Sequence, residues 1–266
     1  MEDTSLLLGH IKDLSLRRDY KDILTFTSFL TLSEISIIKP FIESSKDIDN
    51  YYFYGGNSYS ERKILFFIPS YISKDDFINN PNIYLEEIIG VIKIYPKNIK
   101  YFENSLTHRD YLGALMNLGL KKECFGDIFL KDKVNAYVFI KKEIENEVLN
   151  NLLKIKHSDV KVDLLSLKDD EIRNLKPNFK ELEVNVSSLR LDNVISSVFT
   201  KLSREDSKTL INNEFVFVNG ITIKSPSFQL KDGDRVSIKS KGKFIFNNVI
   251  KTTRKDRYLI SVCLYN

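Results

Sequence analysis

The chain has 266 residues, of which 42% are hydrophobic and 29% are charged. This length and composition predict a soluble globular protein of two or three modules, and they argue against a disordered chain or a membrane protein. No apolar run approaches the roughly 18 residues of a membrane helix, and the N-terminus lacks a signal-peptide pattern, so we expect a cytoplasmic protein without membrane insertion. Cys124 and Cys263 have no CxxC or Cys/His spacing, so neither a disulfide framework nor a zinc site is expected.

The positive charge is concentrated at the C-terminal end of the chain. Residues 187–266 contain 14 Lys or Arg and 7 Asp or Glu, a net charge of +7, whereas the remainder has 26 against 29, or −3. A folded basic segment favours phosphate backbones, because each neutralised phosphate releases counterions. The charge pattern therefore indicates a candidate nucleic-acid-binding region.

The first 50 residues have a helical pattern. Apolar residues recur at helical spacing between positions 23 and 38, and Pro40 is expected to break this pattern. The pair Gly55-Gly56 marks a turn before a predicted strand over residues 63–69. No GxGxxG or GxxxxGK pattern surrounds these glycines, so they predict no nucleotide site. Residues 1–85 are therefore expected to form an N-terminal helical region with a strand.

Residues 86–168 predict a ferredoxin-like domain. The expected elements are a strand at 88–96, a helix at 107–120, a hairpin of 127–132 with 135–141, a helix at 142–155 and a strand at 160–167. This β-α-β-β-α-β order is also the frame of RNA-recognition modules, although the third strand has no RNP1-like run. The strand aromatics are either stacking surfaces for bases or, as is more common, core residues: Tyr95, Phe129, Tyr137 and Phe139. The polar segment 169–186 predicts a linker.

Residues 187–266 predict a small α+β domain. Apolar residues from 191 to 199 recur at helical spacing, and Ser203 followed by Asp206 predicts the start of a second helix. The pair Asn219-Gly220 predicts a tight hairpin, and a turn at Asp232-Gly233 leads into another strand. Two further strands, at 243–251 and 257–265, would close the sheet around a basic turn.

Four short motifs in this segment occur in a specific order: RLD at 190–192, SR at 203–204, VNG at 218–220 and GD at 233–234. Their order and spacing resemble the RNA-binding domain named for small-subunit ribosomal protein four, called the S-four domain below. The resemblance implies that the start of the second helix and the neighbouring hairpin face structured RNA, where Arg forks and a helix N-terminus suit phosphate oxygens. The predicted RNA-binding residues are Arg190, Lys201, Ser203, Arg204, Lys208, Asn219, Lys224, Lys239, Lys241, Lys243, Arg254 and Lys255.

Some of these residues have structural interpretations as well. Asp192 is expected to hold Arg190 or to cap a backbone group, Asn219 is needed for the turn, and Lys224 is equally well explained as a solvated strand residue. The chain also departs from the S-four pattern at Glu205, Asp206, Glu214 and Phe217, where basic, small or glycine residues are usual. These changes either weaken RNA binding or shift it toward the lysines at 239, 241 and 243 and the turn at 254–257.

The resemblance extends upstream. The segment 106–132, LTHRDYLGALMNLGLKKECFGDIFLKD, together with the earlier GG…ERK run, resembles the YlmH family of bacterial S-four proteins, in order from about Tyr54 onward. This resemblance implies an α+β protein with helical, RNA-recognition-like and S-four parts. It also implies a role with stalled large ribosomal subunits in ribosome-associated quality control, and a link to cell division. The expected partners are large-subunit RNA, tRNA and quality-control or division proteins, bound by a monomer without a cofactor.

Two motifs resemble catalytic motifs, but the other sequence elements that catalysis requires are missing. The RLD motif occurs in pseudouridine synthases, but too little chain follows Asp192 for their catalytic domain. His108-Arg109-Asp110 matches the kinase HRD, yet the kinase asparagine, glycine-rich loop and DFG are absent, and Thr107 with Asp110 predicts a helix cap. The histidines are too scattered for a metal cluster. A non-enzymatic RNA-binding protein is the favoured prediction; a scaffold or regulator of cell division and an RNA-modifying enzyme stay open as alternatives.

Overall fold

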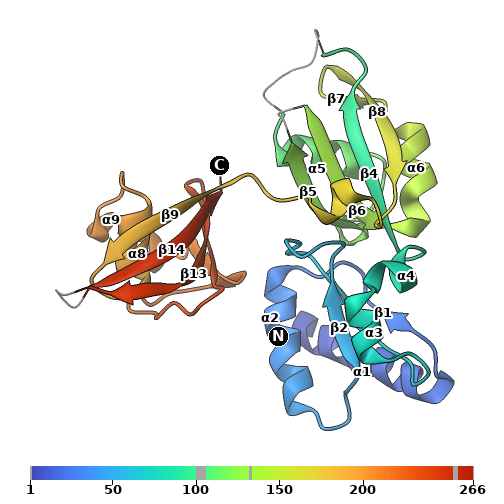
Figure 1. The fold of residues 1–266 in the computed structure, drawn as a ribbon, viewed down its shortest axis with the longest axis horizontal. Coiled ribbons are helices and arrows are strands. Elements are labelled where there is room, and N and C mark those ends of the chain that lie inside the picture. The colour runs from blue at the N-terminus through green and yellow to red at the C-terminus, as the bar shows by residue number, and fades with distance from the viewer. Residues whose placement is uncertain (1, 100–105, 132–133, 254–256, 266) are drawn as a thin grey trace. The chain divides into compact units, whose positions relative to one another are not determined.

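The computed structural model describes residues 2–99, 106–131, 134–253 and 257–265. The chain forms two compact units, Met1–Pro177 and Asn178–Asn266, whose elements are labelled in Figure 1. Both units mix helices with antiparallel sheets, so the fold class is α+β, as predicted. Within the described ranges, no helix has the length and apolar character needed to cross a bilayer.

The N-terminal part consists of two helices and a three-stranded sheet in the order β1-β3-β2. Its helices are α1 (Glu2–Lys21) and α2 (Leu32–Ser44), and its strands are β1 (Thr25–Phe26), β2 (Tyr51–Tyr54) and β3 (Ile64–Phe67). The predicted strand at 63–69 is confirmed. The helical pattern expected over the first 50 residues is interrupted at residues 25–26, because Thr25 pairs with Phe67 in the sheet.

Proline 40 does not end the second helix. It lies inside α2, which begins with a capping box of Thr31 and Glu34 and continues to Ser44. A proline costs a helix one backbone hydrogen bond. The buried Ile38 and Ile42 on either side of Pro40 pack into the core with Ile11 and Phe67, and this packing offsets the loss.

The central domain has the predicted β-α-β-β-α-β order. Two short helices, α3 (Lys74–Asn79) and α4 (Pro81–Leu85), lead into it. Its main elements are β4 (Ile89–Pro96), α5 (His108–Met116), β5 (Phe125–Lys131), β6 (Asn135–Lys141), α6 (Glu145–Asn151), β7 (Lys154–Ile155) and β8 (Ser158–Leu165). The sheet order is β5-β6-β4-β8-β7. The helix predicted to reach residue 155 ends earlier, because Lys156 adopts a φ of 51° and turns residues 154–155 back onto β8.

Both faces of the central sheet are buried. Alternate strand residues such as Ile92 and Val138 pack against α5 and α6. The residues between them, among them Val91 and Phe139, share a core with Phe66 of β3, as well as with Phe29 and Phe77. The N-terminal part therefore covers the face that the helices leave open.

The segment expected to be a linker carries secondary structure instead. It contains α7 (Asp170–Arg173), whose Ile172 is fully buried in the core of the first unit, and β9 (Phe179–Val186), which pairs with the last strand of the second unit. The polar side chains of 169–186 lie on the exposed sides of these two elements. In the sequence, the boundary between the two units falls between Pro177 and Asn178.

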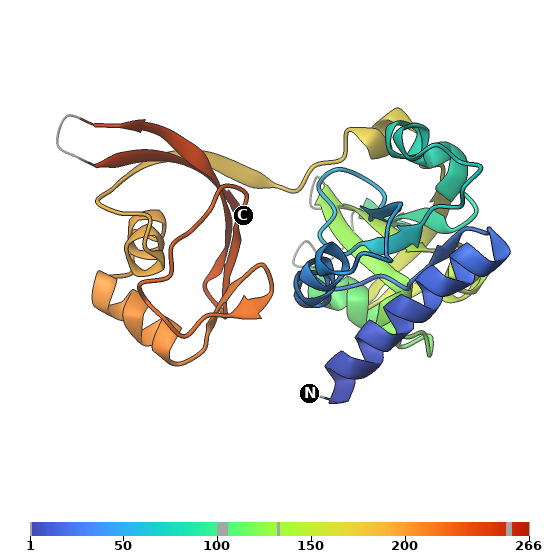
Figure 2. The same ribbon diagram turned by 90° about the horizontal axis from the view of Figure 1, so that it is seen from below.

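The second unit packs two helices against a six-stranded antiparallel sheet, as Figure 2 shows. The helices are α8 (Leu191–Val198) and α9 (Arg204–Asn212). The strands are β10 (Val216–Val218), β11 (Ile221–Thr222), β12 (Arg235–Ile238), β13 (Gly242–Thr252) and β14 (Tyr258–Tyr265), and the sheet order is β11-β10-β12-β13-β14-β9. Asn219 and Gly220 have φ angles of 52° and 80°, which confirms the predicted hairpin turn.

Candidate nucleic-acid interface

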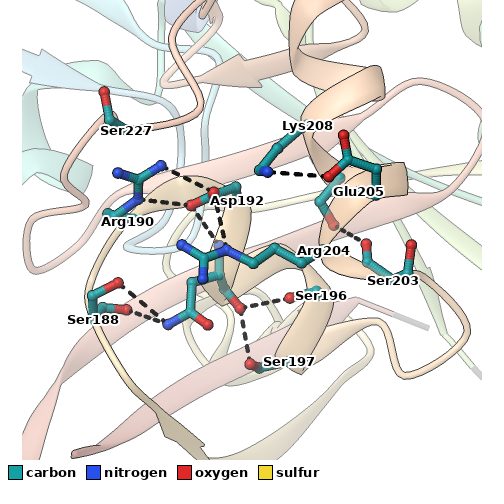
Figure 3. Close-up of polar contacts among 12 residues, drawn as sticks. Ser188, Arg190, Asp192, Ser196, Ser197, Ser203, Arg204, Glu205, Lys208 and Ser227 are labelled. Carbon is teal, nitrogen blue, oxygen red and sulfur yellow. Dashed lines mark hydrogen bonds and ion pairs between the residues drawn. The ribbon is translucent and has the colours of Figure 1, made fainter.

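A buried carboxylate organises the polar surface of the second unit. Asp192, in the first turn of α8, is fully buried. Arg190 donates hydrogen bonds to it from Nε and Nη2, each at 3.1 Å, and Arg204 donates from Nε at 3.2 Å (Figure 3). Burial acts to raise the pKa of this carboxyl, but the two arginines outweigh it and hold the pKa below its ordinary value. Asp192 thus has the structural role predicted for it, and it holds a second arginine as well.

The two arginines keep part of their donor capacity for a ligand. The side chains of Arg190 and Arg204 are 35% and 48% exposed. Arg204 uses only Nε, and no described residue hydrogen-bonds its two Nη atoms. A guanidinium that is already hydrogen-bonded to a carboxylate has lost side-chain freedom before it binds a ligand. Its remaining N–H groups have the geometry to donate hydrogen bonds to phosphate oxygens. Asp192 therefore presents two oriented cations at the surface.

The start of α9 lies beside this pair. The Ser203 side chain accepts a hydrogen bond from the Asp206 amide at 3.0 Å, and the Asp206 carboxylate accepts one from the Ser203 amide at 2.9 Å. This is the predicted capping box, and these bonds with Ser203 hold the pKa of the Asp206 carboxyl below its ordinary value. Lys208, one turn further along, forms an ion pair with Glu205 at 3.1 Å. Ser203 is thus primarily a helix cap, and Lys208 is partly neutralised.

Lysines of the β12–β13 turn supply further positive charge. Lys241 is close enough to Asp206 to contribute to the lowering of its pKa, so this turn lies near the start of α9. Lys239 Nζ lies 5.3 Å from the ring centre of Phe215, which is itself 39% exposed. Lys243 Nζ lies 4.8 Å from the ring centre of Tyr265. The predicted shift of the contact toward these lysines stays a prediction, but the structure brings Lys241 and Arg204 to one helix start.

Other predicted contact residues have different surroundings. Asn219 donates from Nδ2 to Asp234 at 2.7 Å and accepts from the Arg235 amide at 3.0 Å, so its side chain holds the hairpin together. Lys201 is exposed in the segment between α8 and α9. The predicted contacts Arg254 and Lys255 lie outside the described residues.

The departure from the S-four pattern at residue 214 has a visible consequence. Glu214 has a φ of 62°, in the left-handed region that favours glycine, which accounts for the glycine usual at this position. Its carboxylate forms an ion pair with Lys224 at 2.7 Å. The substitution thus adds backbone strain and neutralises one predicted RNA contact.

One supporting residue has no signal in the sequence. Asn193, which is 8% exposed, donates from Nδ2 to the Ser188 carbonyl at 2.8 Å. This bond ties α8 to the segment that carries Arg190. Only the fold brings Ser188 within reach of Asn193, so the spacing of residues could not reveal this support.

Three of the four strand aromatics of the central sheet are core residues. Phe129, Tyr137 and Phe139 are 5%, 1% and 0% exposed, so the stacking interpretation is wrong for them and the core interpretation is confirmed. Tyr95 is half-buried, and its hydroxyl donates to Asp163 at 3.1 Å. The Tyr137 hydroxyl donates to Glu171 of α7. The three buried rings are therefore not accessible for stacking on bases.

The HRD sequence is accounted for by helix capping. Asp110 accepts hydrogen bonds from the amide and the hydroxyl of Thr107, each at 2.8 Å, which confirms the predicted cap. The part of the chain that the structure describes contains no group of three or more His, Cys, Asp or Glu side chains that could hold a metal ion.

Comparisons with known proteins agree with this architecture. Residues 90–169 match the family model described as "Putative RNA-binding domain in YlmH", and residues 189–236 match the S4 domain model. The chain is 28% identical to ribosome-associated protein quality control protein P2 of Bacillus subtilis over 211 residues, which is 79% of this chain and 76% of that protein. It is 34% identical to small ribosomal subunit protein uS4c of Eimeria tenella over 92 residues, which is 34% of this chain and 46% of that protein.

A solved structure is also similar. The cell division protein ylmH from Streptococcus pneumoniae superposes with a TM-score of 0.46 and 17% identity, over 63% of this chain and 94% of that chain. At this TM-score, the structural similarity carries no conclusion about fold or function.

The two domain matches indicate an RNA-binding protein with an S-four domain in its C-terminal unit. Most of the chain aligns with a bacterial relative named as a ribosome-associated quality control protein. The chain is thus similar to the YlmH proteins in its RNA-binding domain.

Proposed function

We propose that this protein acts in ribosome-associated quality control by binding structured RNA of the large ribosomal subunit, or the tRNA on it, through its S-four domain. The arginine pair on Asp192, the start of α9 and the β12–β13 turn form the contact surface. Binding is electrostatic and non-enzymatic, and the protein binds as a monomer in the cytoplasm.

One observation carries this proposal. Two guanidinium groups share a single buried carboxylate, so the cluster of Arg190, Asp192 and Arg204 keeps a net charge of +1 and directs its remaining donors outward. The name of the Bacillus subtilis relative, which covers most of both chains, supports the link with ribosome-associated quality control. The matched uS4 proteins, which are named as small ribosomal subunit proteins, support a ribosomal setting for the protein.

The test is co-sedimentation of the full-length protein with purified large ribosomal subunits at several salt concentrations. Arg204→Gln should weaken binding about tenfold and flatten the salt dependence, because one phosphate contact is lost. Glutamine is preferred to glutamate at this position, because a second carboxylate beside the buried Asp192 would disturb the fold as well as the binding.

A second variant separates binding from folding. Lys239 and Lys241 are exposed, so the double variant Lys239→Gln/Lys241→Gln should fold normally and still bind more weakly. Lys180→Gln, an exposed lysine on the edge strand β9, is the matched control and should bind like the parent protein. If all these variants co-sediment equally at every salt concentration, the proposed surface is not the one that contacts the ribosome.

A further inference from the structure

The central domain has an open groove on its helical side. The groove has a volume of about 590 Å³ and lies between α5 and the segment from the end of α6 into the β7–β8 turn. Its lining includes Arg109, Gly113, Asn117, Asn151, Leu152 and Lys156. We call it the α5–α6 groove. A volume of this size is in the range of small-molecule and cofactor sites.

Small residues make the floor of the groove apolar and accessible. Gly113 and Ala114 lie on α5, opposite Leu152 and Leu153. A Cβ atom built on Gly113 would meet no other atom within 4 Å, so open space lies directly above the helix backbone. Leu153 is 56% exposed. A flat apolar floor beside a helix backbone is a surface on which a planar ring can lie.

The rim of the groove is polar and mainly basic. Three cations, Arg109, Lys154 and Lys156, line it together with one carboxylate, Asp110. Asp110 already accepts the bonds of the α5 cap, and it pairs with Lys156 at 3.1 Å. The lining therefore has a formal net charge of +2.

Side-chain amides on opposite sides add hydrogen-bonding groups. Asn117 lies at the end of α5 and Asn151 at the end of α6, and both line the groove. An amide offers donors and an acceptor, as the edge of a base does. The Nδ2 of Asn151 already donates to Glu147, so Asn151 contributes its Oδ1 acceptor. The combination of an apolar floor, amides and cations matches the three parts of a nucleotide: base face, base edge and phosphate.

Part of the opposite side of the domain is covered. Phe139 and Tyr137 are buried beneath the N-terminal part and α7, so these aromatics of the sheet face used by RNA-recognition modules are not accessible. The groove lies on the helical side, within residues 90–169, the range matched to a YlmH RNA-binding domain. It is thus an open surface of this domain that has the chemistry for RNA.

We propose that the α5–α6 groove binds an unpaired nucleotide of RNA, with the base against Gly113 and Leu152 and the phosphate near Arg109 and Lys156. This inference rests on the proposed function, because both require the protein to bind RNA. It assigns a second contact, to single-stranded RNA, to a domain separate from the S-four surface.

The test measures binding of fluorescein-labelled single-stranded oligoadenylate and oligouridylate to the full-length protein by fluorescence anisotropy. Gly113→Leu fills the groove and should weaken binding at least about fivefold. Leucine also has a higher helix propensity than glycine, so α5 should not be destabilised. Gly9→Leu is the matched control, because Gly9 is likewise helical and a Cβ there also meets nothing within 4 Å.

A second variant tests the rim. The double variant Arg109→Gln/Lys156→Gln should bind the same oligonucleotides more weakly, and the salt dependence of this binding should decrease. This expectation does not depend on the result for Gly113→Leu. Equal affinities for the parent, Gly9→Leu, Gly113→Leu and the double variant would overturn the inference.

Competition with adenosine monophosphate tests whether the groove binds RNA or a free nucleotide, and we expect the monophosphate to displace the oligonucleotides only weakly. Ribosome co-sedimentation separates this inference from the proposed function of the S-four domain. If the monophosphate binds in a manner that depends on Gly113 while the oligonucleotides do not, the groove is a free-nucleotide site and the RNA assignment is wrong. Loss of ribosome co-sedimentation in Arg204→Gln, with unchanged oligonucleotide binding in Gly113→Leu, would leave the proposed function standing and remove the groove.

Discussion

The two larger sheets of this protein are covered in different ways. The central sheet has α5 and α6 on one face and the N-terminal part on the other, and its strand residues in both cores are almost completely buried. The sheet of the second unit packs one face against α8 and α9, and its strands keep exposed polar residues such as Glu181 and Glu183 of β9.

This difference decides which aromatic and polar groups of each unit are accessible. A ferredoxin-like sheet can bind RNA only where its face is open, and here aromatic residues that could stack on bases serve as core. In the second unit the polar groups lie at a helix start, where a buried carboxylate orients two arginines. The topology of an RNA-binding fold does not determine which of its surfaces is accessible. The elements that pack against the fold determine it.

The largest expected effect comes from the covered face of the central sheet. Phe139 is fully buried, and Gly56 and Gly126 pack directly against its side chain. Phe139→Ala should lower the free energy of unfolding of the first unit by about 3–5 kcal/mol, the usual result of removing a buried phenylalanine. Hydrogen-exchange mass spectrometry of the full-length protein should show faster exchange in β4 and β6.

The matched control is Phe215→Ala, which removes an exposed phenylalanine from the second unit. It should leave exchange in β4 and β6 unchanged. If Phe139→Ala weakened RNA binding while exchange in the first unit stayed the same, the covered face would be a binding surface after all, and the contrast between the two sheets would fail.

The next effect concerns the carboxylate in the second unit. Asp192→Ala removes the acceptor of three charged hydrogen bonds from two arginines, so the free energy of unfolding of this unit should fall by about 2 kcal/mol. It should also weaken ribosome co-sedimentation, because both arginines lose their orientation. If co-sedimentation is weakened in Arg204→Gln but unchanged in Asp192→Ala, the arginines bind without being positioned by Asp192.

Acid should weaken the second unit through the same residue. The pKa of Asp192 in the folded protein lies below its ordinary value of 3.8, so its stabilising contribution is complete above about pH 4 and is lost as the pH falls through the folded-state pKa. In Asp192→Asn this loss should be absent, and the unfolding free energy of this unit should depend less on pH below 4. Urea titrations between pH 5 and pH 2.5 measure the difference.

The smallest effect is a gain. Glu214→Gly relieves a left-handed backbone conformation and should raise the stability of the second unit by about 1 kcal/mol, since the exposed ion pair with Lys224 contributes little. It also frees Lys224, so binding to large ribosomal subunits should tighten slightly at low salt. Glu205→Gly, on α9, changes the same residue type without a strained φ and should be destabilising instead.

Local signals predicted most of the second unit. The cap formed by Ser203 and Asp206, the Asn219-Gly220 turn and the spacing of apolar residues in α8 each act within a few residues, and each appears in the structure. The same holds for the alternation of strands and helices in the central domain. Patterns of this kind are read from neighbouring residues, which is why they predicted elements well.

The errors involve contacts between distant residues. β1 exists because Thr25 meets Phe67, and β9 exists because its polar strand finds β14, so neither could be recognised from its own sequence. The pairing of Arg204 with Asp192 and the burial of Phe139 depend in the same way on the assembled fold. The cations of the S-four motif and the contact of Asp192 with Arg190 were predicted; the second contact of Asp192, with Arg204, was not.

The pairing of β9 with β14 has a consequence for synthesis of the protein. β9 is the first strand of the second unit and β14 is the last, and they are joined by eight residue pairs from Tyr258↔Val186 to Tyr265↔Phe179. A growing chain cannot close this sheet until residues 258–265 have left the ribosomal exit tunnel. The second unit should therefore complete its fold only after its own residues have been translated.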